Sequence, residues 1–146
     1  MAALRSRSND LDTDGIAAHV ARVFGGATDL PINGAFLFGS SLGQPRPDSD
    51  IDVALVPIGE PSLRAWEIQG DAERLLPPYL GHPFDVTVLG SGLFAFEVVR
   101  TGRLVFVRDE PAVWDFIAFV ARRGPDLEYR HRRAVAEVLA GGRGRA

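Results

Sequence analysis

The chain of 146 residues contains no cysteine and no lysine. Without cysteine there is no disulfide and no thiolate metal site. Without lysine there is neither the lysine of a Walker-type phosphate loop nor an amine for Schiff-base chemistry, so any side-chain cation that contacts phosphate must be arginine. No apolar run reaches the ~18 residues of a membrane-spanning helix. The first nine residues carry arginines with no apolar stretch after them, unlike a secretory signal, so we expect a cytoplasmic protein with no membrane contact.

What is present fits one folded domain. Hydrophobic residues make up 46% of the chain and the formal net charge is −3. This length can bury a core of its own. We expect a flexible N-terminus over residues 1–9, a single domain over 10–140 and a disordered tail over 141–146. The three histidines lie far apart without metal-ligand spacing, so none is predicted to be a metal ligand or a catalytic group: His19, His82 and His131.

Apolar periodicity and turn residues predict helices that alternate with strands. The expected helices cover residues 13–24, 61–76, 91–100, 110–121 and 127–140, with a short one near Ser40 or Ser41. Ser91 is the expected N-cap of its helix, and Gly124-Pro125 is expected to separate the last two helices. The expected strands cover residues 34–38, 50–56, 84–89 and 103–108. This alternation predicts an α/β or α+β fold.

The main chemical signal lies between Ala35 and Val56. An apolar strand is followed by a Gly39-Ser40 turn, and Asp50 and Asp52 then open the next apolar strand. Alternation along a strand places both aspartates on one face. Neighbouring carboxylates repel each other unless a cation lies between them, and Mg²⁺ takes hard oxygen ligands while it retains substrate phosphates. The sequence therefore predicts a magnesium site here.

The Gly-Ser turn predicts a phosphate-binding turn beside the magnesium site. Glycine lets a phosphate approach the backbone, and N–H groups at a turn or helix start bind anions. The candidate nucleotide-binding residues are Gly39, Ser40, Ser41 and Arg46. Ser40 alone would more often be a helix N-cap, Arg46 could equally be a solvated loop residue, and an isolated Asp-x-Asp is common. It is the combination that favours the functional interpretation.

This combination resembles the nucleotidyltransferase superfamily related to DNA polymerase β. In that family the Gly-Ser turn and the Asp-x-Asp strand hold a nucleoside triphosphate and its metal ions, and a third carboxylate stands on a later strand. The resemblance implies a mixed, twisted sheet of about four strands with helices on one face. Asp85 is the candidate third carboxylate, on the strand face opposite Phe84 and Val86. The alternative for Asp85 is a strand-edge residue that faces water.

In the reaction that the resemblance implies, a nucleoside monophosphate is transferred and pyrophosphate is released. Two metal ions can clamp the attacking and leaving oxygens of such a displacement. Asp50 and Asp52 would hold the ion that carries the triphosphate, and Asp85 would share the second ion. Asp85 is also the candidate to accept the proton of the acceptor hydroxyl. We therefore expect Asp50, Asp52 and Asp85 to be both catalytic and metal-binding, with ATP as substrate.

Residues 96–106 narrow the resemblance to minimal nucleotidyltransferases, in which a helix ending in Arg-x-Gly precedes a short strand. Such proteins often act as antitoxins for a small helical ribonuclease, the HEPN toxin, and some adenylylate it. Two features depart from the family pattern. The loop between Gly-Ser and Asp-x-Asp is one residue shorter, and Ser41 stands where an arginine is frequent.

Four functions remain open at this point. The favoured one is transfer of AMP from ATP to a protein partner such as a HEPN toxin, because little of the chain is left to enclose a small acceptor. The others are nucleotidylation of a small molecule such as an aminoglycoside in a pocket completed by a homodimer, an antitoxin that acts by binding alone, and nucleic-acid binding. The last is suggested only by seven arginines among the final 25 residues, against three acidic residues.

The segment 112–121 carries more large apolar residues than one core-facing helical stripe accommodates. We expect some of them to be exposed or to be covered by another subunit. The alternative is a helix packed on two sides within the monomer. Together with the arginine-rich helix after it, this segment is the predicted partner interface.

Overall fold

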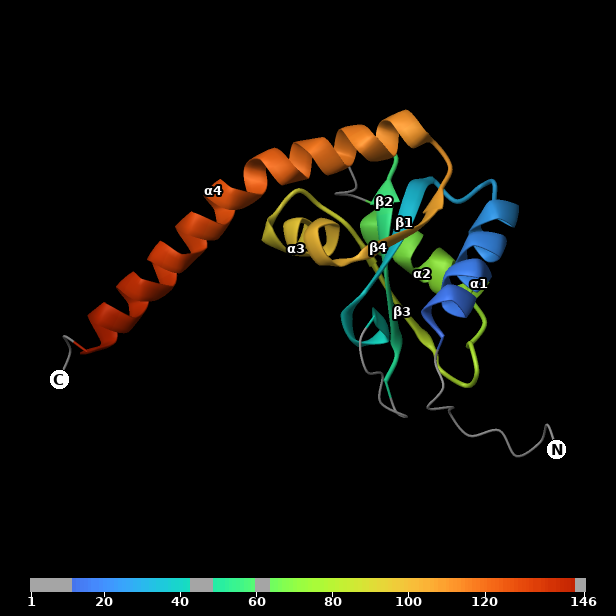
Figure 1. Ribbon diagram of the computed structural model, residues 1–146, viewed down its shortest axis with the longest axis horizontal. Coiled ribbons are helices and arrows are strands. Elements are labelled where there is room, and N and C mark those ends of the chain that lie inside the picture. Colours follow the sequence, from blue (N-terminus) through green and yellow to red (C-terminus); the bar gives the residue numbers. More distant parts are fainter. Residues whose placement is uncertain (1–11, 43–48, 60–63, 144–146) are drawn as a thin grey trace.

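The computed structural model describes residues 12–42, 49–59 and 64–143. In chain order the helices are α1 (Thr13–Gly26), the 3₁₀ turn η2 (Gly39–Leu42), α2 (Ala65–Leu75), α3 (Leu93–Thr101) and α4 (Glu110–Arg143), and the strands are β1 (Ile32–Phe38), β2 (Ile51–Pro57), β3 (Phe84–Val88) and β4 (Arg103–Val107). The predicted alternation of helices and strands is confirmed (Figure 1).

The four strands form one mixed sheet in the order β3-β2-β1-β4. β1 runs antiparallel to both of its neighbours, β2 and β4, while β2 and β3 are parallel. The predicted mixed sheet of about four strands is therefore confirmed. Because β1 is antiparallel to β2, the end of β1 lies beside the beginnings of β2 and β3.

Helices cover both faces of the sheet, so the expectation of helices on one face is wrong (Figure 1). On one face, Ile16 and Val20 of α1 and Ile68 of α2 pack in a cluster with Val53. On the other, Val98 of α3 and Val120 of α4 pack in a second cluster with Phe36, Ala54 and Val56. The physical reason is in the strands. β1 and β2 are buried at nearly every position, and a strand that is apolar on both faces needs cover on both.

Arg108 holds together the end of α1 and the turn that leads into β1. Its guanidinium donates hydrogen bonds to the carbonyls of Phe24 and Ala27, each at 2.8 Å, and also to the carbonyls of Leu30 and Ile32. The last carbonyls of a helix have no partner within the helix, and a cation beside them is also favoured by the helix dipole. Arg108 therefore stabilises the α1–β1 connection.

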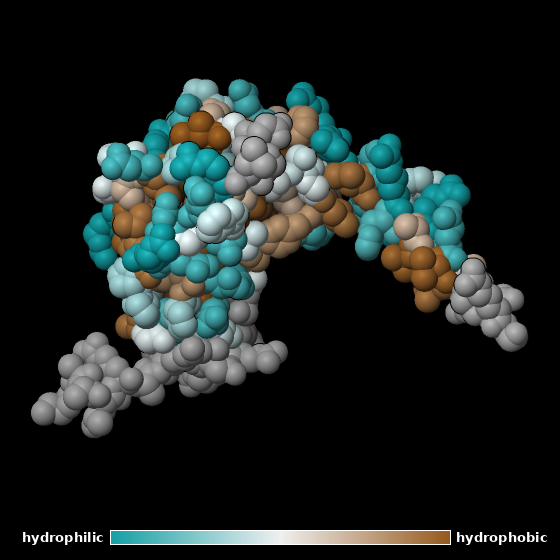
Figure 2. Space-filling view, turned by 180° about the vertical axis from the view of Figure 1, so that it is seen from behind, coloured by the Kyte–Doolittle hydropathy of each residue, from teal (hydrophilic) through white to brown (hydrophobic). Residues whose placement is uncertain are grey.

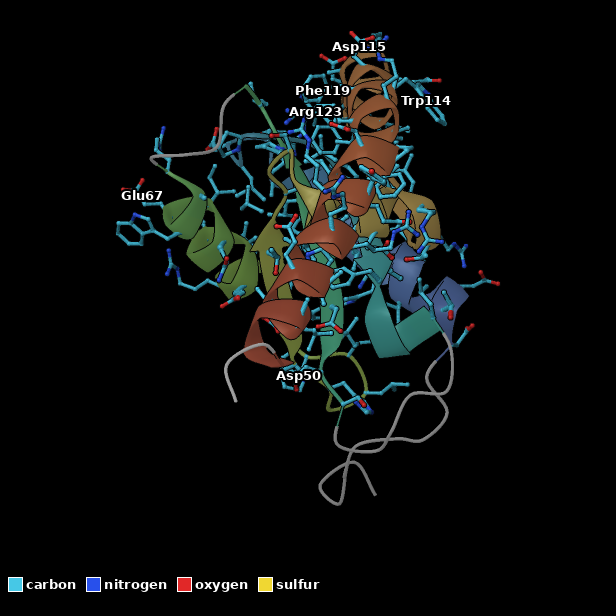
Figure 3. All side chains as sticks on the ribbon, turned by 90° about the vertical axis from the view of Figure 1, so that its left-hand side faces the viewer. Asp50, Glu67, Trp114, Asp115, Phe119 and Arg123 are labelled. Atoms are coloured by element: carbon cyan, nitrogen blue, oxygen red, sulfur yellow. The ribbon has the colours of Figure 1, made fainter. Side chains whose placement is uncertain are left out.

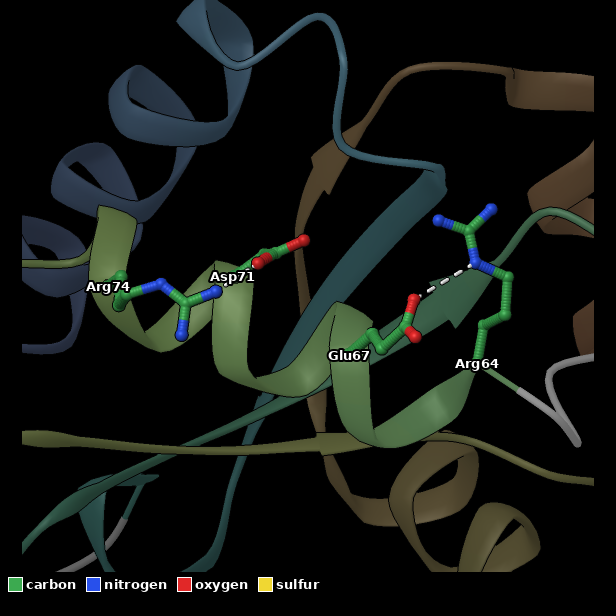
Figure 4. A network of polar contacts seen from close by, with 4 residues as sticks. All are labelled: Arg64, Glu67, Asp71 and Arg74. Atoms are coloured by element: carbon green, nitrogen blue, oxygen red, sulfur yellow. Dashed lines mark hydrogen bonds and ion pairs between the residues drawn. The ribbon is translucent and has the colours of Figure 1, made fainter.

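Helix α2 covers the sheet with Ile68 and Ala72 and exposes a charged face. On that face, Arg64 pairs with Glu67 at 3.3 Å and Arg74 pairs with Asp71 (Figure 4). Exposed pairs of this kind contribute little stability. The edge strand β3 is tied to α2 by a further contact, because the Val86 N–H donates to a Glu73 carboxylate oxygen at 3.3 Å.

Helix α4 is one continuous helix of 34 residues, so the expectation that Gly124-Pro125 separates two helices is wrong. Gly124 is buried, and a Cβ at this position would overlap the ring of Phe96 on α3. The glycine therefore serves a close helix contact instead of a chain break. Proline inside a helix removes one backbone hydrogen bond and bends the axis. Figure 1 shows α4 changing direction near its middle, in the region of Pro125.

Residues 126–143 of α4, here called the arm, project away from the sheet (Figure 1). The arm is exposed along almost its whole length. Apolar side chains near its end, Val135, Val138 and Leu139, are exposed, and Figure 2 shows apolar side chains on the edge of the arm that faces the body of the protein. The acidic residues of the arm are each paired with an arginine one helical turn away: Arg130–Asp126, Arg132–Glu128 and Arg133–Glu137.

Other boundaries differ from the prediction by a few residues. Helix α3 begins at Leu93 with Gly92 as its N-cap residue and no side-chain cap, so Ser91 is not the cap. Helix α2 begins at Ala65, and its expected start at Pro61 lies outside the described residues. Helix α4 ends at Arg143, three residues into the expected tail. None of the helices within the described ranges is long and apolar enough to cross a lipid bilayer.

Candidate active site

The sheet register brings the predicted aspartates together at one end of the sheet, where β2 and β3 begin and β1 ends. Asp52 of β2 lies directly opposite Asp85 of β3 on one side and opposite Phe38 of β1 on the other. Neighbouring strands lie about 4.8 Å apart, so residues in register that share a face are in contact range. Both aspartates point to the face that carries α3, because their neighbours Val53 and Val86 belong to the cluster on the opposite face. Two residues 33 positions apart in sequence therefore form a carboxylate pair.

Gly39 packs directly against the carboxylate of Asp52. It follows β1 directly, begins η2 and has a φ of +76°, a conformation that non-glycine residues rarely adopt. A Cβ at Gly39 would overlap the Oδ2 atom of Asp52. Glycine is therefore needed here for two reasons, the turn itself and the space beside the carboxylate. The backbone of η2 continues through Ser40 and Ser41, which places the predicted phosphate turn next to the carboxylate pair.

The electrostatics of the site centre on Asp52. Burial raises the pKa of Asp52, and the nearby carboxylates of Asp85 and Asp50 raise it further. Asp50 stands directly before β2 and is exposed, as is Asp85, whereas Asp52 is only partly exposed. The carboxylates of Asp85 and Asp50 thus each repel that of Asp52, and a cation bound beside Asp52 would relieve that repulsion.

His82 is a residue of this end of the sheet that the sequence analysis did not assign to the site. Its ring is fully buried, and its Nδ1 lies 2.7 Å from the carbonyl oxygen of Ser49, to which it donates because a carbonyl can only accept. The Ile51 N–H donates in turn to the Pro83 carbonyl at 2.9 Å. These two bonds fasten the segment before β2 to the segment before β3. They set where the two aspartate-bearing strands begin.

A local signal for this arrangement does exist in the sequence. Tyr79 and His82 form an antiparallel bridge around Leu80 and Gly81, which both have positive φ. A tight turn with glycine at its second central position is typical of hairpins. It could have predicted a hairpin before β3. It could not have predicted that the His82 ring is directed towards Ser49.

The other predicted site residues divide into two groups. The backbone of Ser40 and Ser41 lies in η2, whereas Arg46 is outside the residues that the structure describes. In the described ranges, no three acidic or histidine side chains gather closely enough to hold a metal ion as they stand. The structure brings together the pair Asp52 and Asp85, with Asp50 near enough to affect the pKa of Asp52. Their hard oxygen donors, with Gly39 packed closely against Asp52, fit a magnesium ion that keeps substrate phosphates.

The site lies away from other notable surfaces. Figure 3 shows Asp50 at the opposite end of the molecule from Trp114, Asp115, Phe119 and Arg123. An open hollow of about 390 Å³ lies where the ends of α1 and α2 meet, and it is lined by Gly26, Ala27, Thr28, Asp29, Leu30, Asp71, Arg74 and Leu75. It contains none of the predicted site residues.

A mixed sheet that sets paired aspartates beside a Gly-Ser turn defines the chain as a nucleotidyltransferase. Residues 27–111 match the family described as "Polymerase beta, Nucleotidyltransferase". This match covers more than half of the sequence, and the chain belongs to that family. No curated protein matches the chain.

Solved structures show the same fold at low sequence identity. One, described as a toxin-antitoxin crystal structure with AMP-PNP, superposes with a TM-score of 0.60 at 18% identity, over 84% of this chain and 98% of the other. A second, described as the toxin-antitoxin MntA-HepT, gives a TM-score of 0.55 at 16% identity, over 84% of this chain and 97% of the other. At these identities the likeness shows a shared fold.

Proposed function

We propose that this protein transfers AMP from ATP, in a Mg²⁺-dependent reaction, to a hydroxyl group of a partner protein, and that the partner is a HEPN-type toxin which the reaction neutralises. The observation that carries the proposal is the in-register pair Asp52 and Asp85 with Gly39 packed against Asp52. Membership of the nucleotidyltransferase family supports the reaction class. The partner class is supported by the fold shared with toxin-antitoxin structures, one of which holds a nucleotide analogue.

Each residue of the site has a distinct task in this reaction. Asp50 and Asp52 would hold the metal ion that accompanies the triphosphate, and Asp85 would share a second ion with Asp52. When bound, the metal ions neutralise phosphate charge during the displacement. The backbone N–H groups of η2, which starts at Gly39, would bind phosphate oxygens. His82 is a positioning residue, because its bond to Ser49 aligns the starts of β2 and β3.

The transfer step balances without any further reactant. The acceptor hydroxyl oxygen bonds to the α-phosphorus of ATP, while the bond from that phosphorus to the oxygen bridging to the β-phosphate breaks. Pyrophosphate leaves with the electron pair of the broken bond. The hydroxyl proton passes to a carboxylate, and Asp85 is suited to accept it because it is exposed at the site.

A protein acceptor fits the openness of the site and the exposure of α4. The paired aspartates lie at the end of the sheet where β2 and β3 begin, and the described residues form no second domain over this end. On α4, Val113 and Val120 are buried while Trp114 and Phe119 are 54% and 42% exposed, which confirms the expectation that part of this apolar helix is left uncovered. The arm adds an exposed apolar edge (Figure 2). Exposed apolar surfaces of this kind mark sites of protein–protein interaction.

The test uses the full chain with Mg²⁺, ATP labelled at the α-phosphate, and the HEPN-type protein encoded beside its own gene. We expect labelled AMP on the partner and loss of its ribonuclease activity. Asp85→Asn should slow transfer about 10²–10⁴-fold, as loss of a general base typically does. Glu67→Gln is the matched control, because Glu67 is exposed on α2, which covers the sheet face opposite to the carboxylate pair, away from Asp50 (Figure 3), and its substitution should leave the rate unchanged.

Two results would replace the proposal. If Asp85→Asn neutralised the toxin as well as the parent chain, and no label reached the partner, the protein would act by binding alone. If the label reached an aminoglycoside and no protein, the acceptor would be a small molecule. Nucleic-acid binding is not supported by the arm, because Arg130, Arg132 and Arg133 are each paired with an acidic residue, which offsets their positive charge.

A further inference from the structure

Helix α3 has one flank that the fold leaves open. Ala95 and Val98 are buried towards the sheet. On a second side, Phe96 packs against Gly124 of α4. Helix α4 starts beyond β4, whose end lies opposite Gly34 near the start of β1. The remaining flank of α3, which carries Phe94, is therefore turned towards the end of β1, where the aspartates lie.

An exposed aromatic ring stands on this flank. Phe94 is 47% exposed, and its ring centroid lies 5.3 Å from that of Phe38, with the two planes 79° apart. This edge-to-face packing fixes the orientation of the ring. Phe38 is the residue directly before Gly39 and lies opposite Asp52 in the register. The aromatic pair is therefore built into the same end of the sheet as the carboxylates.

The arrangement suits one nucleotide that spans both features. Phe38 is the strand neighbour of Asp52, about 4.8 Å away by backbone spacing, and its ring contacts that of Phe94, so a single side chain links the exposed ring to the carboxylate. One nucleoside triphosphate bound with its phosphates at the carboxylates can therefore direct its base towards the Phe94 ring. A half-exposed phenyl ring presents a face on which any base can stack, and no hydrogen-bond readout is required.

We propose that Phe94, supported by Phe38, is the stacking surface for the nucleobase of the bound triphosphate. This inference rests on the proposed function, because it assumes that the phosphates lie at the aspartates. It specifies the ligand class further. Because stacking grows with ring area, the site binds purine nucleotides more tightly than pyrimidine nucleotides, with little discrimination between adenine and guanine.

Calorimetry on the full chain separates stacking from phosphate binding. Phe94→Ala should weaken ATP binding about 5- to 100-fold, the range for loss of one stacked base. Inorganic tripolyphosphate with Mg²⁺, which has no base, should bind the variant and the parent equally. Phe94→Trp should retain or improve ATP affinity. The control is Phe119→Ala, because Phe119 is similarly exposed at 42% but packs with Arg123 of α4, far from Asp50 (Figure 3).

The outcomes distinguish this inference from the proposed function. Equal ATP affinity for Phe94→Ala and the parent would overturn the stacking role and leave the transfer reaction standing. A raised KM for the protein acceptor with unchanged ATP affinity would also overturn it, since the ring would then contact the acceptor. A parallel loss of tripolyphosphate affinity would show a general structural role for Phe94. A parent chain that bound neither ATP nor tripolyphosphate would overturn both proposals.

Discussion

Replacement of Asp52 by asparagine should stabilise the metal-free protein. The Asp52 carboxylate is partly buried and interacts with the charges of Asp85 and Asp50, and these causes together raise its pKa. At neutral pH the folded state therefore carries a penalty that the unfolded chain lacks. Asparagine keeps the shape of the side chain and removes its charge. The substitution should thus act against the usual tendency of mutations to destabilise.

The size of the expected stabilisation can be estimated from the pairing of Asp52 with Asp85. Like charges directly opposite each other on neighbouring strands cost roughly 0.2–1 kcal/mol. For a domain of this size a change of 1 kcal/mol shifts Tm by about 2–4 °C. We therefore expect Asp52→Asn to raise Tm by about 0.4–4 °C in EDTA, as followed by circular dichroism. Asp115→Asn, which removes an equal charge at the opposite end, should change Tm far less.

The pH dependence of stability provides a second test of the charge penalty at Asp52. The penalty is fully present above the raised pKa of folded Asp52 and disappears below the pKa of an unfolded aspartate, because the carboxyl is then protonated in both states. The stability difference between Asp52→Asn and the parent should therefore shrink as the pH falls. Saturating Mg²⁺ and ATP should reverse the ranking, because ligand stabilises only a chain that binds it. A lower Tm for the variant in EDTA would refute the reasoning, since it would reveal a stabilising partner for the Asp52 charge.

Three further substitutions test other parts of the structure. Gly39→Ala should lower stability by about 1–2 kcal/mol because of its positive φ, and should weaken ATP binding because the new methyl group displaces the Asp52 carboxylate; unchanged ATP affinity in calorimetry would separate Gly39 from the site. Arg108→Met should cost about 1.5–3 kcal/mol, because four backbone carbonyls lose a charged donor, and a denaturant midpoint equal to that of the parent would contradict this. Val138→Glu should weaken the complex with the toxin in a pull-down titration and leave Tm and ATP affinity unchanged, because Val138 is 74% exposed on the arm; equal toxin affinity would move the interface elsewhere.

Local patterns were sufficient to predict most of the fold. The alternating helices and strands and the face of Asp85 could be predicted because each depends on the period of apolar residues along a short segment, whereas the mixed sheet is implied by the family resemblance. The juxtaposition of Gly39 with Asp52 could be predicted only through the family resemblance. No local pattern contains the pairing of β1 with β2 or the parallel pairing of β2 with β3.

The errors share a physical cause, which is tertiary packing. Gly124-Pro125 is a helix-breaking sequence, but the contact between Gly124 and Phe96 favours a continuous helix. Cover on both faces of the sheet depends on how α3 and α4 pack, which strand burial suggests only once the register is known. The roles of His82 and Arg108 arise from bonds to backbone carbonyls remote in sequence, and side-chain type does not predict such bonds.

The arm has a mechanical consequence. Residues 126–143 extend for about 27 Å at 1.5 Å per residue, and residues 129–141 are all exposed, whereas Gly124 packs against the body at Phe96. The arm is therefore a lever whose pivot lies at the bend near Pro125. A tilt of about 10° at the pivot moves the tip by about 5 Å, whereas the helix contact at the pivot shifts by a small fraction of that. A partner bound at the tip of the arm would therefore exert a force on the contact between Gly124 and Phe96. Phe96 belongs to α3, the same short helix that carries Phe94.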